Sequence, residues 1–443
     1  MKILILLTTF FEYLFALFVI LDCNTPYAVA LDRNYYITEI VMILIIILLI
    51  LNFIINHISK RLISNWLKIF FPYYLIMFTF LLVNVSDEKR VNFMARFLIA
   101  LPILTLLFGI YQKSNDIYRI LKRLTNVISV LSLISLFFWF FGSQLHYLSP
   151  TGQILSYWGY EFNYPSYYGL YFERQMDNFL WIHGYRNIGI FCEGPMFSLI
   201  LVISLFTEIF LFQEDSTKKL LNIVNGKIYL NNVKGILRNR IKISILVITL
   251  VTTTSTTGMV LLVLLLLLKY AINSPKEKYK LILKWVSGLF IIVGGLIIMN
   301  NLLETKSNSN SWLIRMSDYN IGFKAWMNSP LFGNGYGDWT SLQSLMSENF
   351  RTNTGFSNAI FTVLSQGGIV LMLVYVISII GYFRCFLKYK NKVVLVFEII
   401  FLIEFVVTLF QYTFIMMILL AYGYTYMACN LEERNNEKMR NLV

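Results

Sequence analysis

Two features suited to binding an anion stand close together in the second half of the sequence. Arg315 belongs to a helix predicted over residues 311–329, with Ser311 as its N-cap and Pro330 after its end. The same helix face carries residues at spacings of three and four, Tyr319, Gly322 and Trp326. A turn then follows, Gly333-Asn334-Gly335-Tyr336-Gly337. Because a guanidinium pairs with oxyanions and glycines let backbone amides approach them, we expect an anion site here. The alternative is an ordinary helix followed by a tight turn.

A second arginine stands beside a carboxylate at the start of an apolar segment. The stretch Arg186-Asn187-Ile188-Gly189-Ile190-Phe191-Cys192-Glu193-Gly194-Pro195 runs directly into it. A fixed guanidinium stabilises negative charge that develops in a reaction, and a carboxylate accepts a proton. Arg186 and Glu193 are therefore candidates for catalysis. Alternatively, Arg186 reaches lipid headgroups and Glu193 pairs with it.

The composition shows which class of protein must position these residues. Hydrophobic residues make up 57% of the 443 residues, against about 45–50% in soluble proteins. Charged residues make up 14%, and the mean hydropathy is +0.65. These values exclude an ordinary soluble protein and predict one that crosses a membrane many times. The four cysteines and three histidines have no metal-ligand spacing, so we expect neither a metal nor a cofactor.

The net charge of +13 is explained by topology rather than by nucleic-acid binding. Basic residues gather in every second loop between apolar segments, as the positive-inside bias predicts for cytoplasmic loops. Two ambiguous regions, 243–270 and 393–429, have basic loops at both ends, so each must cross the membrane twice. The first turns at the polar run Thr252–Gly258. We therefore predict an all-α polytopic membrane protein with about 12 transmembrane helices and both termini cytoplasmic.

The predicted spans are separated by two large extracytoplasmic loops. The expected divisions are a five-helix membrane part (1–141), a first outer loop (142–189), central membrane helices (190–300), a second outer loop (301–357) and C-terminal helices with a cytoplasmic tail (358–443). The first loop is rich in aromatic residues, Tyr185 among them. An interfacial aromatic belt explains some of them. Stacking on sugar rings is the functional alternative, because aromatic faces pack on apolar sugar faces.

Three signals in this order resemble the O-antigen ligase/polymerase superfamily. They are Arg186-x-x-Gly189…Glu193-x-Pro195 entering a span, the outer turn ending in Thr257-Gly258, and Arg315…Trp326…Pro330-x-x-Gly333-x-Gly335 followed by Ser357-Asn358. The resemblance covers residues 180–375 well, while the N-terminal spans match only in number and hydropathy.

The resemblance implies a substrate and a place of action. Relatives act on undecaprenyl-diphosphate-linked glycans at the outer face of the bacterial cytoplasmic (inner) membrane. Polymerases in the superfamily move a growing chain from its lipid diphosphate onto the sugar of a new lipid-linked repeat unit. In the ligase branch the position of Ser357 is commonly histidine, so the serine here favours a polymerase of O-antigen or capsular polysaccharide, a metal-independent glycosyltransferase.

The resemblance also implies roles for individual residues. Arg186 and Arg315 would stabilise the diphosphate as it leaves. The proton of the attacking sugar hydroxyl would pass to Glu193, Asp338 or Glu348, and the sequence does not choose among them. The remaining residues are assigned to substrate binding: Gly333, Gly335, Ser357, Asn358, Trp326 and Tyr185.

We expect membrane lipids as partners, and a chain-length regulator and a flippase as further partners. We do not expect the protein to bind nucleic acid. The alternatives are an O-antigen ligase, a lipid-linked oligosaccharide flippase or other transporter, and a non-enzymatic assembly scaffold. A transporter should show broken helices at matching positions in two halves.

Overall fold

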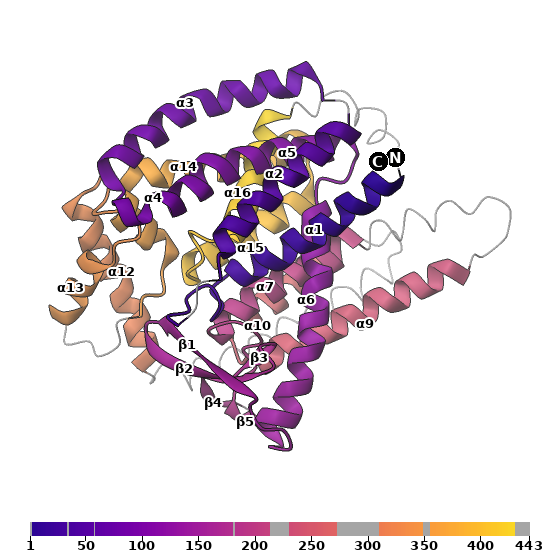
Figure 1. Ribbon diagram of the computed structural model, residues 1–443, viewed down its shortest axis with the longest axis vertical. Helices are drawn as coiled ribbons and strands as arrows, with labels where there is room; N and C mark the ends of the chain where they lie inside the picture. The colour runs from indigo at the N-terminus through magenta and orange to yellow at the C-terminus, as the bar shows by residue number, and fades with distance from the viewer. Residues whose placement is uncertain are drawn as a thin grey trace. The chain divides into compact units, whose positions relative to one another are not determined.

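The computed structural model describes residues 2–32, 35–56, 58–179, 182–212, 230–272, 310–348 and 355–429. The chain forms two compact units. Unit 1 comprises Met1–Val19, Tyr36–Arg119 and Ser317–Val443, and unit 2 comprises Ile20–Tyr35 and Ile120–Met316. Each unit combines segments that are distant in sequence, as the colours in Figure 1 show.

Unit 1 is a bundle of helices around a buried one. Its helices are α2 (Ile37–Ile55), α3 (Lys60–Asn84), α4 (Asp87–Phe93), η1 (Met94–Ala100), α5 (Leu101–Lys113), α13 (Thr340–Glu348), α14 (Ala359–Tyr389), α15 (Lys392–Val407) and α16 (Phe414–Ala428), with most of α1 (Lys2–Asp22) and α12 (Asn310–Asn328). Helix α16 contacts α14, α5 and α3. Nearly all its side chains are buried. A helix that is apolar on every side belongs in such an interior.

Helix α14 is broken near its start, and the chain before α13 fills the break. Gly368 has non-helical angles (φ 59°, ψ −163°). The amides of Ile369 and Val370 then donate to the carbonyls of Pro330 and Leu331. In return, the carbonyls of Ser365 and Gln366 accept from the amides of Asn334 and Gly335. The exchange satisfies backbone groups that a broken apolar helix would otherwise leave without partners.

Unit 2 is built on one buried helix and carries two small sheets. Its helices are α6 (Arg119–Phe138), η2 (Trp139–Gln144), α7 (Gly194–Phe206), η3 (Thr207–Phe212), α9 (Leu230–Thr252) and α10 (Thr256–Ile272). Helix α7 packs against both α9 and α10. Nearly all residues of α7 and of η3, which continues it, are buried.

The segment 142–189 contains β-structure that the sequence analysis did not predict. Strands β1 (Gly152–Trp158), β2 (Tyr160–Tyr167) and β3 (Tyr171–Phe172) form one antiparallel sheet, and β4 (Met176–Phe179) pairs with β5 (Ile182–Tyr185). The all-α expectation therefore holds for the bulk of the described chain but not for this loop. The same tyrosines and tryptophans that indicate a membrane belt or sugar stacking also have high strand propensity.

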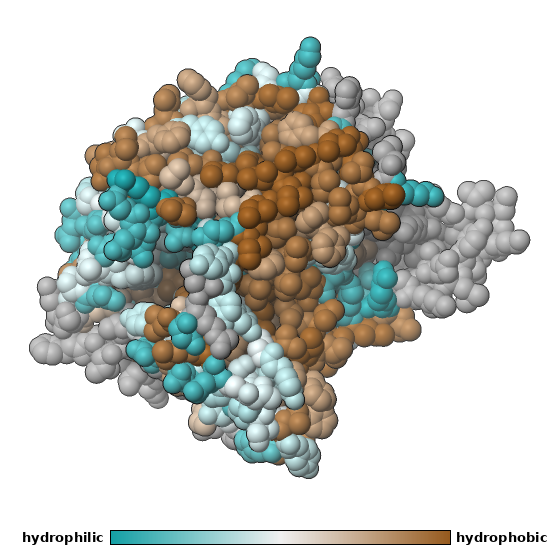
Figure 2. Space-filling model, viewed as in Figure 1, coloured by the Kyte–Doolittle hydropathy of each residue, from teal (hydrophilic) through white to brown (hydrophobic). Residues whose placement is uncertain are grey.

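Seven helical stretches of the described chain are long and apolar enough to cross a membrane. They are Lys2–Asp22, Ile37–Ile55, Lys60–Asn84, Asp87–Lys113, Arg119–Gln144, Gly194–Phe212 and Ala359–Tyr389. Apolar surface covers the region of α1 and α2 in Figure 2. The exposed apolar side chains of these two helices include Ile3, Leu6 and Ile54. Such a surface is expected where lipid replaces water.

Both ambiguous regions contain two helices, as predicted. Helix α9 ends at Thr252 and α10 begins at Thr256, while α15 ends at Val407 and α16 begins at Phe414. The end of the predicted central membrane helices (190–300) and the start of the predicted second outer loop (301–357) lie outside the described residues, at 273–309. The total of about 12 spans, the location of the termini and the domain divisions remain predictions.

Candidate functional site

The first two motifs meet in unit 2. The Nε of Arg186 donates to the carbonyl of Thr253 (2.8 Å), in the turn between α9 and α10. The next residue, Asn187, is fully buried, and its amide and side-chain Nδ2 donate to the carbonyl and Oγ1 of Thr252, each at 3.0 Å. Thr254 donates from Oγ1 to Asp177 Oδ2 at 2.8 Å. The end of the first loop is therefore attached to the polar turn through three consecutive threonines.

The guanidinium of Arg186 lies at the N-terminus of α7. A Cβ on residue 194 would lie 2.6 Å from an Nη atom of Arg186 and 2.8 Å from the carbonyl oxygen of Thr253, so glycine allows this close approach. Glu193 takes the N-cap position of α7 in an extended conformation, and its side chain makes no capping hydrogen bond. The positive end of the helix and the guanidinium both favour a negative group at this place. Glu193 is half-buried in the same place.

A buried carboxylate fixes the start of α14 in unit 1. Asp318 Oδ2 accepts hydrogen bonds from the amide and the hydroxyl of Ser357, at 2.9 and 2.6 Å. Asp318 is 0% exposed and lies in α12, three residues after Arg315. Asn358 caps α14 by accepting from the amide of Phe361 at 3.0 Å. The sequence analysis missed Asp318, although an acidic residue near Arg315 in the same helix was a visible signal.

Four of the five amides of the glycine turn have partners within the protein, so these four do not face an anion as the sequence analysis expected. The amides of Gly333 and Gly335 donate to the carbonyls of Ser329 and Gln366, at 2.9 and 3.3 Å. The amides of Asn334 and Tyr336 donate to the carbonyls of Ser365 and Asn84, at 2.8 and 3.0 Å. The glycines serve close packing instead. Gly333 has φ +76°, and a Cβ there would overlap the backbone of Gln366 and Gly367.

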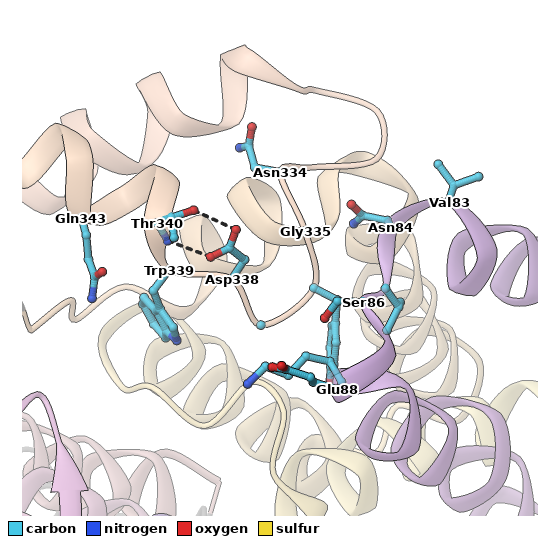
Figure 3. A pocket seen from close by; sticks show the side chains of 14 residues that line it. Val83, Asn84, Ser86, Glu88, Asn334, Gly335, Asp338, Trp339, Thr340 and Gln343 are labelled. Carbon is cyan, nitrogen blue, oxygen red and sulfur yellow. Dashed lines mark hydrogen bonds between the residues drawn. The ribbon is translucent and has the colours of Figure 1, made fainter.

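A pocket of about 650 Å³ opens beside this turn, within unit 1 (Figure 3). Its lining comes from the α3–α4 connection and from the turn leading into α13: Val83, Asn84, Val85, Ser86, Glu88, Lys89, Asn334, Gly335, Tyr336, Gly337, Asp338, Trp339, Thr340 and Gln343. Two residues predicted for the site, Gly335 and Asp338, are among them. The α3–α4 residues and Trp339 were not predicted, because short polar connections and single aromatics carry no distinctive sequence signal.

Asp338 holds the start of α13 and is itself held in place. Its Oδ1 accepts from the amide of Thr340 (2.9 Å) and its Oδ2 from the Thr340 hydroxyl (2.8 Å). Gln366, which is fully buried, donates from Nε2 to the Asp338 carbonyl at 2.9 Å. A carboxylate has about four lone-pair positions, so each oxygen keeps the capacity to accept a further hydrogen bond.

The other predicted residues have structural contacts or lie outside the described side chains. Trp326 donates from Nε1 to the carbonyl of Pro330 (3.1 Å) and closes the end of α12. The carbonyl of Tyr185 accepts from Trp139 Nε1 and Gln144 Nε2, at 2.8 and 3.1 Å. Arg315 lies in α12 and Glu348 ends α13, but neither side chain belongs to the described part. Arg186 and Glu193 belong to unit 2, and Trp326, Gly333, Gly335, Asp338, Ser357 and Asn358 to unit 1.

Among the described residues, no three His, Cys, Asp or Glu side chains gather in a way that could hold a metal ion. The expectation of a metal-independent site stays a prediction.

Comparison with known families gives a match over part of the chain. The family described as O-antigen ligase matches residues 241–376, which include the α9–α10 turn, α12, the glycine turn and the first half of α14. The match supports a relationship with the superfamily of O-antigen ligases and related polymerases, glycosyltransferase-like enzymes that act on lipid-linked glycans. No curated protein sequence and no solved structure matches the chain.

Proposed function

We propose that this protein joins undecaprenyl-diphosphate-linked oligosaccharide repeat units into a surface polysaccharide at the outer face of the bacterial cytoplasmic membrane. The observation that carries the proposal is the family match over residues 241–376, which holds two of the three ordered motifs. The remaining motif, Arg186 to Pro195, precedes the matched region and is hydrogen-bonded to its residues Thr252 and Thr253.

Contacts within each unit support the placement of the predicted outer segments on one side of the membrane. In unit 1, the Gly333–Gly337 turn, which belongs to the predicted second outer loop, lines one pocket together with the α3–α4 connection. In unit 2, the first loop and the α9–α10 turn, both predicted to be outside, are hydrogen-bonded.

The proposed reaction is a glycosyl transfer. The hydroxyl oxygen of the acceptor sugar attacks the anomeric carbon of the donor glycan, and the bond from that carbon to the diphosphate oxygen breaks. The electron pair leaves with the lipid diphosphate, and the hydroxyl proton passes to a carboxylate. Arg186, beside the N-terminus of α7, would stabilise the leaving diphosphate together with Arg315. Glu193, Asp338 and Glu348 stay as the candidate bases.

Ser357 favours a polymerase over a ligase. The superfamily's ligases commonly carry histidine at this position, and a histidine can donate, accept or carry a proton near neutral pH. Here Ser357 donates its hydroxyl to the buried Asp318. The serine thus ties the end of the second loop to α12, the helix that carries Arg315, and any proton transfer falls to another residue.

Deleting the gene tests the function. We expect long-chain surface polysaccharide to disappear while single repeat units still reach the outer face on their lipid or on the final acceptor. Loss of every repeat unit from the final acceptor, with long lipid-linked chains still made, would instead indicate a ligase. Retention of lipid-linked units at the inner face would indicate a flippase. Unchanged polysaccharide would contradict all three.

Arg315→Lys tests the arginine assigned to the diphosphate. Lysine keeps the charge but loses the planar fork, so we expect the rate of polymerisation to fall by two to three decades, or about 2.7–4 kcal/mol. Lys324→Arg in the same helix is the matched control, because Lys324 is exposed. Polymer chain length is compared at equal protein abundance in the membrane. Wild-type chains from Arg315→Lys would assign this arginine to structure alone.

A further inference from the structure

The pocket beside the Gly333–Gly337 turn is held open by contacts that leave its walls little freedom. Tyr336 is 4% exposed, and its ring packs against Phe93 and Tyr412, with ring centroids 5.1 and 4.6 Å apart. Asn84 donates from Nδ2 to the carbonyls of Phe332 and Gln366. The turn, the α3–α4 connection and the break in α14 are thus joined to one another. A preformed pocket binds a ligand without the cost of ordering its walls.

An aromatic ring forms part of the pocket's lining. Trp339 packs on a buried apolar cluster of Ile321, Ala325, Leu342, Met346 and Phe356 and also lines the pocket. It is half-buried, which means that packing fixes one part of the indole while another part stays accessible. In Figure 3, Trp339 lies beside Asp338 and Thr340, and Gln343 extends from the next turn of α13. A ring fixed in this way offers a flat apolar face surrounded by polar groups.

The charges around the pocket argue against a phosphate as its occupant. Two carboxylates, Glu88 and Asp338, and one ammonium, Lys89, line it. Counted in their charged forms, these three side chains carry a formal charge of about −1. Four of the five amides of the glycine turn, those of residues 333–336, would otherwise attract an anion, but they donate to carbonyls within the protein. An uncharged polyhydroxyl ligand, or one with an amino group, therefore suits this lining better than a diphosphate does.

We infer that this pocket is a saccharide subsite, in which a sugar ring of a repeat unit stacks on Trp339 while Asp338, Gln343 and Lys89 hydrogen-bond its hydroxyls. The volume of about 650 Å³ lies within the range of about 300–1,000 Å³ typical of small-molecule sites. A protein binds a sugar through an apolar face that packs on the ring and through hydrogen-bond donors and acceptors directed at its hydroxyls. The lining of this pocket supplies both. The inference rests on the proposed function for the identity of the glycan.

Direct binding tests the subsite without any requirement for turnover. The probe is the free repeat-unit oligosaccharide, obtained by mild hydrolysis of the producing strain's own surface polysaccharide. Saturation-transfer NMR measures its binding to the full-length protein in detergent. We expect transfer to the sugar protons with the wild type, at least a tenfold weaker affinity with Trp339→Ala, and recovery of most of the affinity with Trp339→Phe. Ser344→Ala is the matched control, because Ser344 is exposed on α13 and does not line the pocket.

Competition separates a saccharide site from an anion site. Inorganic diphosphate in excess should leave the oligosaccharide bound, and its displacement by diphosphate would overturn the inference. Equal affinity of the wild type and Trp339→Ala would do the same, with thermal unfolding of both variants measured to confirm folding. Failure of the proposed function gives a different pattern: the gene deletion leaves polysaccharide chains of normal length, whatever the result of the binding measurement.

Discussion

The two polar turns of the matched region satisfy their backbone groups in opposite ways. In the turn between α9 and α10, the hydroxyls of Thr252 and Thr253 donate to carbonyls of the preceding helical turn. The carbonyls of the same two residues accept from Asn187 and Arg186. The Gly333–Gly337 turn has no serine or threonine, and the amides of Asn334, Gly335 and Tyr336 donate to carbonyls of other segments. The first turn therefore attaches an arginine, while the second closes a helix break.

This difference shows that a glycine-rich turn is not by itself an anion site. Glycine gives a backbone the freedom to approach another surface closely, and that surface can be a ligand or another part of the chain. At Gly333 it is the backbone of α14. The arginine held on the threonine turn, with the N-terminus of α7 beside it, is the better anion-binding arrangement among the described residues.

Gly333→Ala should lower the stability of the protein more than any other change proposed here, because it prevents the close approach to α14 that the second turn requires. The positive φ alone costs a non-glycine residue about 1–2 kcal/mol, and overlap with the backbone of Gln366 and Gly367 adds to this. We expect little folded protein in the membrane, measured by abundance and by thermal unfolding in detergent.

Gly337→Ala is the control for this substitution. Residue 337 also has a positive φ of +70°, but its Cβ would meet only the side chain of Lys89, at 3.6 Å. This variant should accumulate to a clearly higher level than Gly333→Ala. Equal abundance of the two would show that strain, and not the contact with α14, explains the glycine at 333.

Arg186→Lys should have the next largest effect, and on activity more than on stability. If Arg186 stabilises the leaving diphosphate, the rate falls by about 2.7–4 kcal/mol, or two to three decades. The measurement is polymer formed from isolated lipid-linked repeat units by equal amounts of folded protein. A rate within threefold of the wild type would remove Arg186 from the reaction.

Arg174 lies in the same loop as Arg186, but we expect it to have a structural role only. It donates from Nη1 to the Tyr164 hydroxyl (2.6 Å) and from Nη2 to the Trp158 carbonyl (2.7 Å), which joins the sheet to the rest of the loop. Arg174→Lys should lower the free energy of unfolding by about 1.5–3 kcal/mol while each folded molecule keeps its rate. A loss of rate without a loss of stability would contradict the structural role.

Thr254→Val tests a single side-chain hydrogen bond of the first turn and should have a smaller effect. It removes the hydrogen bond to Asp177, which should cost about 1.5–3 kcal/mol at most, since the acceptor is a carboxylate. A double-mutant cycle with Asp177→Asn, followed by thermal unfolding, measures the coupling between the two side chains. Purely additive effects would mean that the bond contributes nothing to the attachment of the loop.

Cysteine labelling should have the smallest effect on function while testing that both turns face outside. Gly152→Cys in the first loop and Ser344→Cys in α13 should react with an impermeant thiol reagent in intact cells, and Lys392→Cys should not. Residue 152 has open space around its Cβ position, and residues 344 and 392 are exposed. Labelling at 392 in intact cells would reverse the orientation.

The native Cys192 supplies an internal control for this experiment. Its side chain is fully buried, and burial raises the pKa of its thiol well above the usual value. The thiolate is the reactive form, so at pH 7–8 nearly all of the group stays protonated and reacts slowly. Labelling of Cys192 as fast as Gly152→Cys would show that the first loop is not packed as described.

The sequence by itself determined the elements whose signals are local. The predicted helix over 311–329 corresponds to α12 at Asn310–Asn328, because a following proline marks its end. Ser311, the predicted N-cap, lies inside the helix, which begins one residue earlier. The charges on both sides of 243–270 required the chain to reverse, and the structure reverses it at Thr253–Ser255. The order of the three motifs also indicated the superfamily that the match at residues 241–376 supports.

Only the tertiary structure decided what those elements contact. Aromatic residues in the first loop proved to form strands, since tyrosine and tryptophan suit a sheet, a membrane interface and a sugar site alike. The partners of the Asn334 and Gly335 amides depend on a break in α14 more than thirty residues away. A hydrogen bond across such a separation leaves no pattern in either segment. For the same reason, the pocket beside Trp339 emerges only when the α3–α4 connection and α13 come together.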